Sequence, residues 1–342
     1  MASLRLGEGF FLTSNRKDAK QIMGKFQTSF LTGAAVLLLA VWPLVFPEAI
    51  QFQQVLGLTC LYATLALAWN MYALTGAISL GHAAFFGLGA YASALLNHYY
   101  HWSPLLTIPV GALAGVVFAV FWTWCFKRLR GVYLGLASLA AMEIPKTIVD
   151  NWDRLTYGSM GLMGLDRLPS LAFGGLEVDF SMNLAAQYYL LLGVMLTAVL
   201  VHRASIRSRW GWTLRALREN ETAAAMLGIA ANRERARVLM LSSYLAGLTG
   251  GLYAHITGLI EPALVFNLHL SVLPLVFSFF GGSARVWGPV LGAFSLYPLE
   301  QLVLMPMLPM SHSALYGLVI ILTIFFFPKG IAAWLPASPK SV

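Results

Sequence analysis

Glycine, serine and histidine residues gather in one otherwise apolar stretch of the chain, GAISLGHAAFFGLGAY at 76–91. An unwound glycine-rich turn can present backbone N–H and C=O groups to a solute in a membrane cavity, as transporters do near the bilayer midplane. The same residue types also suit a close-packed helix crossing that holds one satisfied polar side chain, and both interpretations stay open. The candidates for a translocation path in this stretch are Gly76, Ser79, Gly81, His82 and Gly87.

A second polar stretch, TYGSMGLMG, follows a segment that carries charged residues and a proline. Pro145 removes a helix hydrogen bond and bends its span, while Glu143 and Lys146 are three residues apart and are expected to form an ion pair on that helix. The Gly-Ser-Met-Gly turn that comes next is flexible and polar enough to line a vestibule on the outer side of the membrane. Gly158 and Gly161 are therefore further candidates for the path.

A third stretch, WGWTLRALRENETAAAMLGIAANRERAR at 210–237, is the most polar piece in the middle of the chain. It predicts a short helix over 221–227, because Asn220 is a good N-cap, Glu221 lies at the favourable end of the macrodipole and Gly228 is a typical stop. A short helix with small alanines can dock into a cleft of another protein. A basic loop resting on anionic lipid headgroups is the alternative, but the interspersed glutamates and the alanine run favour docking.

Motifs for catalysis and for ATP hydrolysis are absent from the sequence. It has no GxxxxGK[ST] phosphate loop, no HExxH and no GxSxG, so the chain does not hydrolyse ATP by the phosphate-loop route. Cys60 and Cys125 both lie in apolar runs, which excludes a disulfide scaffold and a CxxC metal site. We therefore expect no catalytic residues, no metal and no cofactor, and the energy for any active transport must come from another chain.

The composition of the chain indicates the class of protein and the kind of element that hold these three stretches in place. Of the 342 residues, 58% are hydrophobic and 11% are charged, and the mean hydropathy is +0.72, whereas soluble domains carry about 25% charged residues. A water-soluble globule needs a charged surface, so the sequence predicts a polytopic membrane protein. Because a spanning helix needs about 20 apolar residues, the stretches free of Asp, Glu, Lys and Arg predict an all-α bundle of about ten transmembrane helices, some broken or re-entrant.

The uncharged stretches set the expected boundaries of these helices. Residues 49–126 are too long for one span, and their glycine and proline breaks divide them. They predict helices near 52–74, 79–97 and 104–126. The stretch that begins at residue 131 must run on past Glu143, and the one that begins at 286 must run on past Glu300. The remaining spans are expected within 26–47, 180–202, 238–260, 262–284 and 301–328.

The basic residues test this count independently. If the amino terminus is cytoplasmic, 19 of the 22 Lys and Arg residues fall on the cytoplasmic side of a ten-span topology. This asymmetry places both termini in the cytoplasm, and it explains the net charge of +8 without a nucleic-acid partner. The expected organisation is a cytoplasmic segment 1–28, a transmembrane permease domain 29–330 with a cytoplasmic loop 203–237, and a cytoplasmic tail 331–342.

Three blocks of the sequence resemble the permease subunits of the branched-chain amino-acid (Liv-type) ABC importers, in particular the M-type subunit. They are SLGHAAFFGLGAYASALL at 79–96, LRGVYLGLASLAAMEI at 129–144, and the region 211–253. The resemblance covers most of residues 30–330. In that family a loop with an E-x-A-A-x-x-x-G pattern carries a coupling helix that sits in a groove of a cytoplasmic ATPase. The residues that match this pattern are Glu221, Ala223, Ala224 and Gly228.

The resemblance implies a heteromeric importer in the plasma (inner) membrane of a bacterium, with a type II ABC importer bundle. A second homologous permease subunit would complete the path, cytoplasmic ATP-binding-cassette ATPases would drive it, and a periplasmic solute-binding protein would deliver branched-chain or related amino acids. Tyr157 stands where family members often carry glycine, which leaves urea or a short amide open as the substrate. A self-sufficient solute channel or facilitator, with the arginine-rich loop serving only orientation, is the second alternative.

Overall fold

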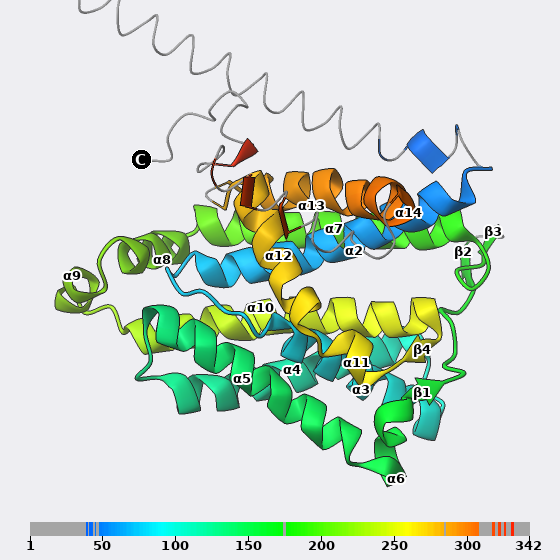
Figure 1. Cartoon of the computed structure of the whole chain (residues 1–342), viewed down its shortest axis with the longest axis horizontal. Coiled ribbons are helices and arrows are strands. Elements are labelled where there is room, and N and C mark those ends of the chain that lie inside the picture. The colour runs from blue at the N-terminus through cyan, green and yellow to red at the C-terminus, as the bar shows by residue number, and fades with distance from the viewer. Residues whose placement is uncertain are drawn as a thin grey trace, which may run out of the picture.

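The computed structural model describes residues 48–173, 176–283 and 285–307, together with a few positions within 39–45 and 317–331. The described chain is almost entirely helical (Figure 1). Six of its helical segments are long and apolar enough to cross a membrane by length and composition. Since each of the six has at least 20 residues, each can reach across a hydrocarbon layer about 30 Å thick. The chain is thus an all-α, multi-pass membrane protein.

The long helices are α2 (Ile50–Ala73), α3 (His82–Tyr100), α4 (Pro104–Phe126), α5 (Gly131–Asp150), α7 (Leu184–Arg207) and α10 (Ala231–Thr257). The shorter ones are α6 (Asp153–Thr156), η1 (Gly158–Met160), α8 (Arg209–Glu219), α9 (Glu221–Met226), α11 (Pro262–Val265), α12 (Leu268–Gly281), α13 (Gly288–Leu299), the π-helical turn η2 (Glu300–Leu304) and α14 (Met305–Met307). The pair α11 and α12 forms one candidate span, and α13 continues through η2 into α14 to form another.

Local sequence signals explain where several helices begin. The side chain of Asn183 accepts hydrogen bonds from the backbone N–H groups of the first turn of α7, at 3.0 and 3.2 Å. Asn267 caps α12 in the same way, accepting from the Leu270 N–H at 2.6 Å. Pro104 opens α4 at a position where its missing N–H costs nothing. These caps satisfy donors that a helix start otherwise leaves without a partner.

The helices form two groups that α2 and α10 join (Figure 1). In one group α3, α4 and α10 pack against one another, with α5 alongside α3 and α4. In the other, α2 packs against α7, α12 and α13. Large apolar side chains that lie fully inside the molecule, such as Trp69, Phe85 and Phe277, belong to both groups. A single continuous core therefore holds the two groups together.

Glycines let the helix backbones of the first group approach closely. A Cβ atom added at Gly89 would collide with the backbone of Gly247, and one added at Gly250 would collide with the carbonyl oxygen of Phe86. A Cβ atom at Gly111 would lie 2.6 Å from the backbone nitrogen of Ser93. Inside a membrane, where lipid tails are as apolar as the helix surfaces, such close approach supplies much of the packing energy.

Most of the predicted helices are confirmed. The long uncharged stretch divides into α2, α3 and α4 at the expected breaks, α5 runs on to Asp150, and the helix from Gly288 runs on past Glu300. The helix predicted from residue 238 begins earlier, at Ala231, because charged side chains of its first two turns form ion pairs outside the apolar span.

The count of ten spans goes beyond what the described residues show. The helices α3 and α10 have the length for a span, at 19 and 27 residues, but they are not among the six segments that also meet the hydropathy requirement. Most of the first predicted span and of the last one, the segment 1–28 and residues 332–342 lie outside the described residues.

Short strands are a feature that the sequence did not predict. Strand β1 (Leu162–Met163) pairs antiparallel with β4 (Leu259–Ile260), and β2 (Leu171–Phe173) pairs antiparallel with β3 (Leu176–Val178). Strands of two or three residues carry no alternating pattern long enough to recognise. The first ladder also joins segments almost a hundred residues apart in the chain, so only the packed structure brings its two halves together.

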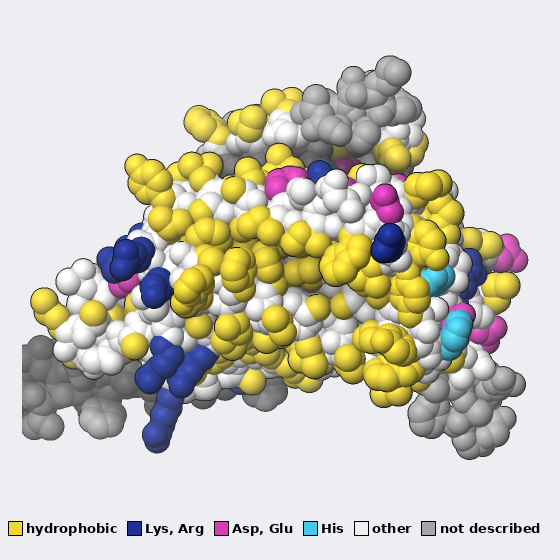
Figure 2. Space-filling model, turned by 90° about the horizontal axis from the view of Figure 1, so that it is seen from below, with side chains coloured by type: hydrophobic (Ala, Val, Ile, Leu, Met, Phe, Trp, Pro, Cys, Tyr) yellow, Lys and Arg dark blue, Asp and Glu magenta, His cyan; other side chains and the backbone are white. Residues whose placement is uncertain are grey.

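The two ends of the bundle differ in charge. Figure 2 shows most of the visible Lys and Arg side chains gathered at the end that carries α8 and α9, most of the Asp, Glu and His side chains with a few Lys and Arg toward the opposite end, and a broad hydrophobic surface between them. Such a hydrophobic band between two charged ends is the surface that a bilayer covers. The short strands lie at the end opposite α9 (Figure 1).

Candidate functional site: the α9 loop and the turn before α3

The short helix α9 forms where the sequence predicts it, and its two ends are capped. The side chain of Asn220 accepts a hydrogen bond from the Ala223 N–H at 3.0 Å. At the other end Gly228 adopts a φ of +83°, and the Ile229 N–H donates to the carbonyl of Ala224 at 3.1 Å. This is a Schellman ending, which requires the left-handed backbone that glycine adopts without strain.

One face of α9 is anchored and the other projects from the protein. Ala224 is buried against the neighbouring helices, while Ala223 and Gly228 are exposed. Beyond them the side chains of Met226 and Leu227 are 84% and 80% exposed. Two large apolar side chains held this far into water at the tip of a capped helix are typical of a surface that another protein covers.

Ion pairs hold α9 to the rest of the protein. Both carboxylate oxygens of Glu221 accept hydrogen bonds from the guanidinium of Arg235 on α10, at 2.9 and 3.2 Å. The guanidinium of Arg130, just before α5, lies 3.4 Å from the same carboxylate. Nearby, the buried Glu234 accepts a hydrogen bond from the Trp210 indole N–H at 2.9 Å, which ties α8 to α10. The α9 loop is therefore connected to both α10 and the start of α5.

The Glu221–Arg235 pair is expected to couple strongly in a double-mutant cycle of the purified protein. Arg235 is mostly buried, so Glu221→Gln leaves a guanidinium without its counter-ion, and we expect a loss of roughly 1–3 kcal/mol in unfolding free energy. Adding Arg235→Gln to this variant should recover part of the lost unfolding free energy. Thermal unfolding of the two single variants and the double variant in detergent measures the coupling.

The Glu143–Lys146 pair is the matched control for this cycle. It has the expected i,i+3 spacing on α5 and an N–O distance of 3.5 Å, and its side chains are 31% and 54% exposed, so solvent screens the pair and its coupling should stay below about 0.5 kcal/mol. Equal coupling energies in the two cycles would contradict a special anchoring role for Glu221.

The turn between α2 and α3 lies beside this loop. Gly76 has a φ of +77°, and a Cβ atom at this position would lie 3.4 Å from the Cα of Arg218 at the end of α8. Farther along the turn, the Trp69 indole N–H donates to the Ser79 carbonyl at 2.7 Å, and the Leu80 N–H donates to the Ser138 hydroxyl at 2.7 Å. The turn is thus unwound, as predicted, and it contacts α2, α5 and α8.

His82 is buried at the start of α3, and both ring nitrogens have hydrogen-bond partners. The Ser242 hydroxyl donates to the Ala68 carbonyl at 2.6 Å, so it can only accept from His82 Nε2–H, 2.9 Å away. Nδ1 of the imidazole is then the acceptor for the Ser79 hydroxyl at 3.1 Å. His82 is therefore a neutral ring that links α2, α3 and α10, the role expected of a satisfied core histidine.

The other path candidates lie at points of close packing. A Cβ atom at Gly81 would collide with the carbonyl of Ser138, and one at Gly87 would collide with the ring of Phe266. Gly158 and Gly161 have positive φ values and belong to the segment around η1 and β1. These two lie at the end of the bundle opposite the α2–α3 turn (Figure 1), so the structure does not bring the candidates together in one site.

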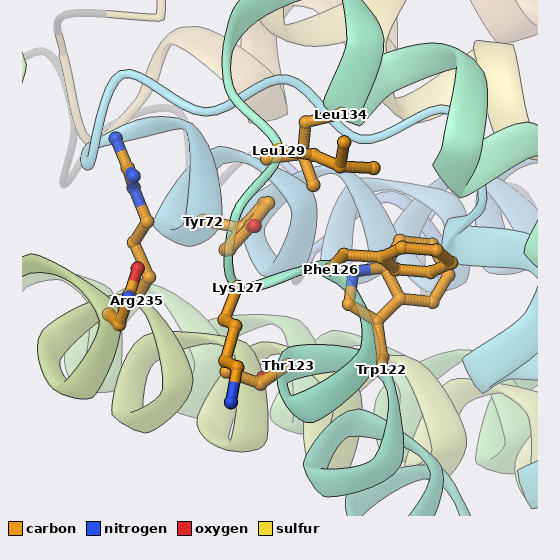
Figure 3. A pocket seen from close by; sticks show the side chains of 9 residues that line it. Tyr72, Trp122, Thr123, Phe126, Lys127, Leu129, Leu134 and Arg235 are labelled. Atoms are coloured by element: carbon orange, nitrogen blue, oxygen red, sulfur yellow. The ribbon is translucent and has the colours of Figure 1, made fainter.

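A recess opens among the ends of α2 and α4 and the starts of α5 and α10. Figure 3 shows Trp122 and Phe126 packed at one side of it, and the cationic side chains of Lys127 and Arg235 apart from them, with Tyr72 between. Its cavity volume of about 20 Å³ has room for a water molecule but not for an amino acid. The recess is therefore not a solute site in this conformation.

Comparison with known proteins assigns the family. The sequence profile of the family described as "Branched-chain amino acid transport system / permease component" matches residues 51–325. The chain belongs to this family. It is a permease component of a branched-chain amino-acid ABC transport system, and as a permease it is a transport subunit rather than an enzyme.

Curated relatives agree with this assignment. The permease is 28% identical to the high-affinity branched-chain amino acid transport system permease protein LivM of Escherichia coli (strain K12) over 296 residues, which are 81% of this chain and 68% of the relative. It is 26% identical to the LivH permease protein of Salmonella typhimurium over 288 residues, which are 79% of this chain and 90% of the relative. No solved structure matches the chain significantly.

At the end opposite α9, this permease holds its connecting loop with a polar cluster that the sequence did not predict, in which the exposed Asp166 meets the buried Asn97 and His255. The Asn97 side chain donates to the Asp166 carboxylate at 2.9 Å and accepts from the Asp166 N–H at 3.1 Å. His255 Nδ1 donates to the Asp166 carbonyl at 2.7 Å. These residues come from α3, α10 and the loop before β2, and no sequence spacing connects them.

Proposed function

We propose that this permease is the M-type transmembrane subunit of an ATP-driven importer and that the α9 tip docks on a cytoplasmic ATPase. The observation that carries the proposal is the capped helix α9, which projects Met226 and Leu227 from the cationic end of the bundle (Figure 2). A purely electrostatic lipid anchor would instead turn cationic side chains outward at its tip. The match of Glu221, Ala223, Ala224 and Gly228 to the family loop pattern supports the same assignment.

The proposal includes an orientation in the membrane. The cationic end with α8 and α9 faces the cytoplasm and the acidic end with the short strands faces outward, in keeping with the positive-inside rule. In this arrangement α3 and α10 also cross the membrane, shielded from lipid by the helices packed around them, and the bundle has about ten spans of the type II importer kind, with both termini inside.

We further propose how motion of the ATPases reaches the path. Glu221 links α9 to α10 through Arg235 and to the start of α5 through Arg130, so displacement of α9 moves two helices at once. Contact between Gly76 and Arg218 passes the same displacement to the turn before α3. The bundle then alternates between outward and inward access as ATP binding and hydrolysis shift the two populations. The glycine and polar residues named as path candidates remain a prediction.

Branched-chain amino acids are the proposed substrates, delivered by a periplasmic solute-binding protein to a path that a second homologous permease completes. The names of the LivM and LivH relatives support this choice over urea or a short amide. A path of backbone groups and small residues suits an aliphatic zwitterion.

Reconstitution tests the proposal. We consider vesicles that contain this chain with its second permease, ATPases and binding protein. They should transport labelled leucine only when ATP is supplied on the side of the membrane that carries the ATPases. Vesicles with this chain alone should show no leucine flux. Flux through the single chain without ATP would identify a channel instead, and ATP-driven uptake of urea but not leucine would contradict the substrate.

A further inference from the structure

Helix α5 carries an ion pair at a depth where a bilayer is apolar. The helix is one of the candidate spans, from Gly131 to Asp150, and the exposed Arg130 marks its cationic end. Glu143 lies seven residues before the last residue of the helix, which puts it about 10 Å inside the span at the usual helical rise. Its carboxylate is 3.5 Å from the ammonium group of Lys146.

This ion pair faces outward from the bundle rather than into it. The side chain of Glu143 is 54% exposed and that of Lys146 is 31% exposed. Figure 1 shows α5 along one edge of the bundle, and its other side packs against α3, α4 and α11. Exposed residues at helical spacing form a single stripe along the outward face of α5, here called the Glu143 stripe, which consists of Tyr133, Leu136, Ala140, Glu143, Ile144 and Thr147.

Lipid is a poor environment for the Glu143 stripe. Taking a carboxylate out of water is costly even when a cation is paired with it. Lys146 can extend its long side chain toward the membrane surface, but the shorter side chain of Glu143 cannot span about 10 Å. Helix α4 presents a surface that does suit lipid, because its exposed side chains are all apolar, among them Leu113 and Val117. The Glu143 stripe therefore needs polar surroundings that lipid does not supply.

We propose that the Glu143 stripe lines the water-filled part of the translocation path, on the side of the bundle where the second permease completes that path. This inference rests on the proposed function, since a path shared by two permeases needs a polar face that each single chain leaves uncovered. Water hydrates the half-exposed carboxylate, and the small side chains of Ala140 and Thr147, about one helical turn to either side of Glu143, leave room for it. In the complete importer α5 thus borders the path, whereas α4 faces lipid.

Cysteine labelling of the complete transporter in lipid nanodiscs tests this inference. A thiol reacts as its thiolate, and a charged thiosulfonate reagent reaches that thiolate only through water. The variants Ala140→Cys and Val117→Cys place a thiol near the middle of α5 and of α4, in a background where the exposed Cys125 is replaced by serine. During ATP-driven turnover Ala140→Cys should react at least about tenfold faster than Val117→Cys, because hydrocarbon excludes the charged reagent.

Uptake measurements connect the labelled position with the path. Unlabelled Ala140→Cys should transport leucine normally, because the Ala140 side chain is exposed and the substitution is small. Labelling adds a bulky charged group to the stripe and should abolish most of that uptake, while Val117→Cys treated in the same way should be unaffected. Leu136→Cys, about one turn away on the same stripe, should behave like Ala140→Cys and provides a second position.

Each other outcome contradicts a different statement. Equal, slow labelling at positions 140 and 117 would mean that the stripe faces lipid or a dry protein contact, and it would overturn the inference. Fast labelling of Ala140→Cys with unimpaired leucine uptake would also overturn it, because the stripe would then meet water outside the path. A wild-type complex that carries no leucine would instead contradict the proposed function, while the labelling rates would still report whether the stripe meets water.

Discussion

Leu227→Glu is expected to separate this permease from its ATPase while leaving the permease folded. The Leu227 side chain is 80% exposed and the neighbouring Met226 is 84% exposed, so neither contributes to the core. At the proposed interface, however, a carboxylate would be buried without a partner in an apolar cleft. Loss of an anchor at the centre of an interface costs about 2–4 kcal/mol, and an unpaired buried charge adds to it. Affinity for the ATPase should fall about a hundredfold or more.

Co-purification from membranes that express the complete transporter measures this effect. Met182→Glu is the matched control, because Met182 is 77% exposed but lies in the connection before α7, at the end opposite α9. That variant should retain the ATPases, and both variants should elute as monodisperse permease with unchanged melting temperatures. Normal recovery of the ATPases with Leu227→Glu would refute the docking role of α9.

Gly250→Val is expected to unfold the group formed by α3, α4 and α10. A Cβ atom at Gly250 would collide with the carbonyl oxygen of Phe86 and lie 3.1 Å from the backbone nitrogen of Ala90. Backbone atoms cannot rotate away as a flexible side chain can, so α3 and α10 must separate. Overpacking of this kind costs about 3 kcal/mol, and it also breaks the contact between Gly89 and Gly247 on the same helix pair.

The melting temperature of the detergent-purified protein and the yield of monodisperse material report this loss. Gly193→Ala in α7 is the control, since an added Cβ there meets nothing within 4 Å, and replacing a helical glycine by alanine gains up to about 1 kcal/mol. Equal melting temperatures for the two variants would contradict the close α3–α10 packing.

Local patterns were enough to predict most helices and the α9 loop. The breaks before α3 and α4 follow from a glycine turn and a proline start, and α9 follows from the Asn220 cap and the Gly228 stop. Each of these signals acts within a few residues, through backbone hydrogen bonds or a restricted φ angle. The sequence also indicates the family, because the α9 loop pattern is contiguous.

Contacts between distant segments were not predictable in the same way. Glu221 was recognised as a helix-start residue, but its pairing with Arg235 and Arg130 depends on how α9 folds back on α10 and α5. Asn97, Asp166 and His255 likewise come from three segments. Many other polar residues in the chain could form such clusters, and their spacing in the sequence does not indicate which of them come together.

Hydropathy, charge asymmetry and helix capping are local properties, so the sequence alone was enough to predict a membrane permease with a short capped helix over 221–227. Which polar residues are buried, and against which partners, depends instead on how the helices pack. His82 is a neutral bridge among α2, α3 and α10, and Glu300, which its helix runs past as predicted, is only 4% exposed. The physical reason is that a polar side chain in a membrane protein takes its role from the partners that helix packing brings to it.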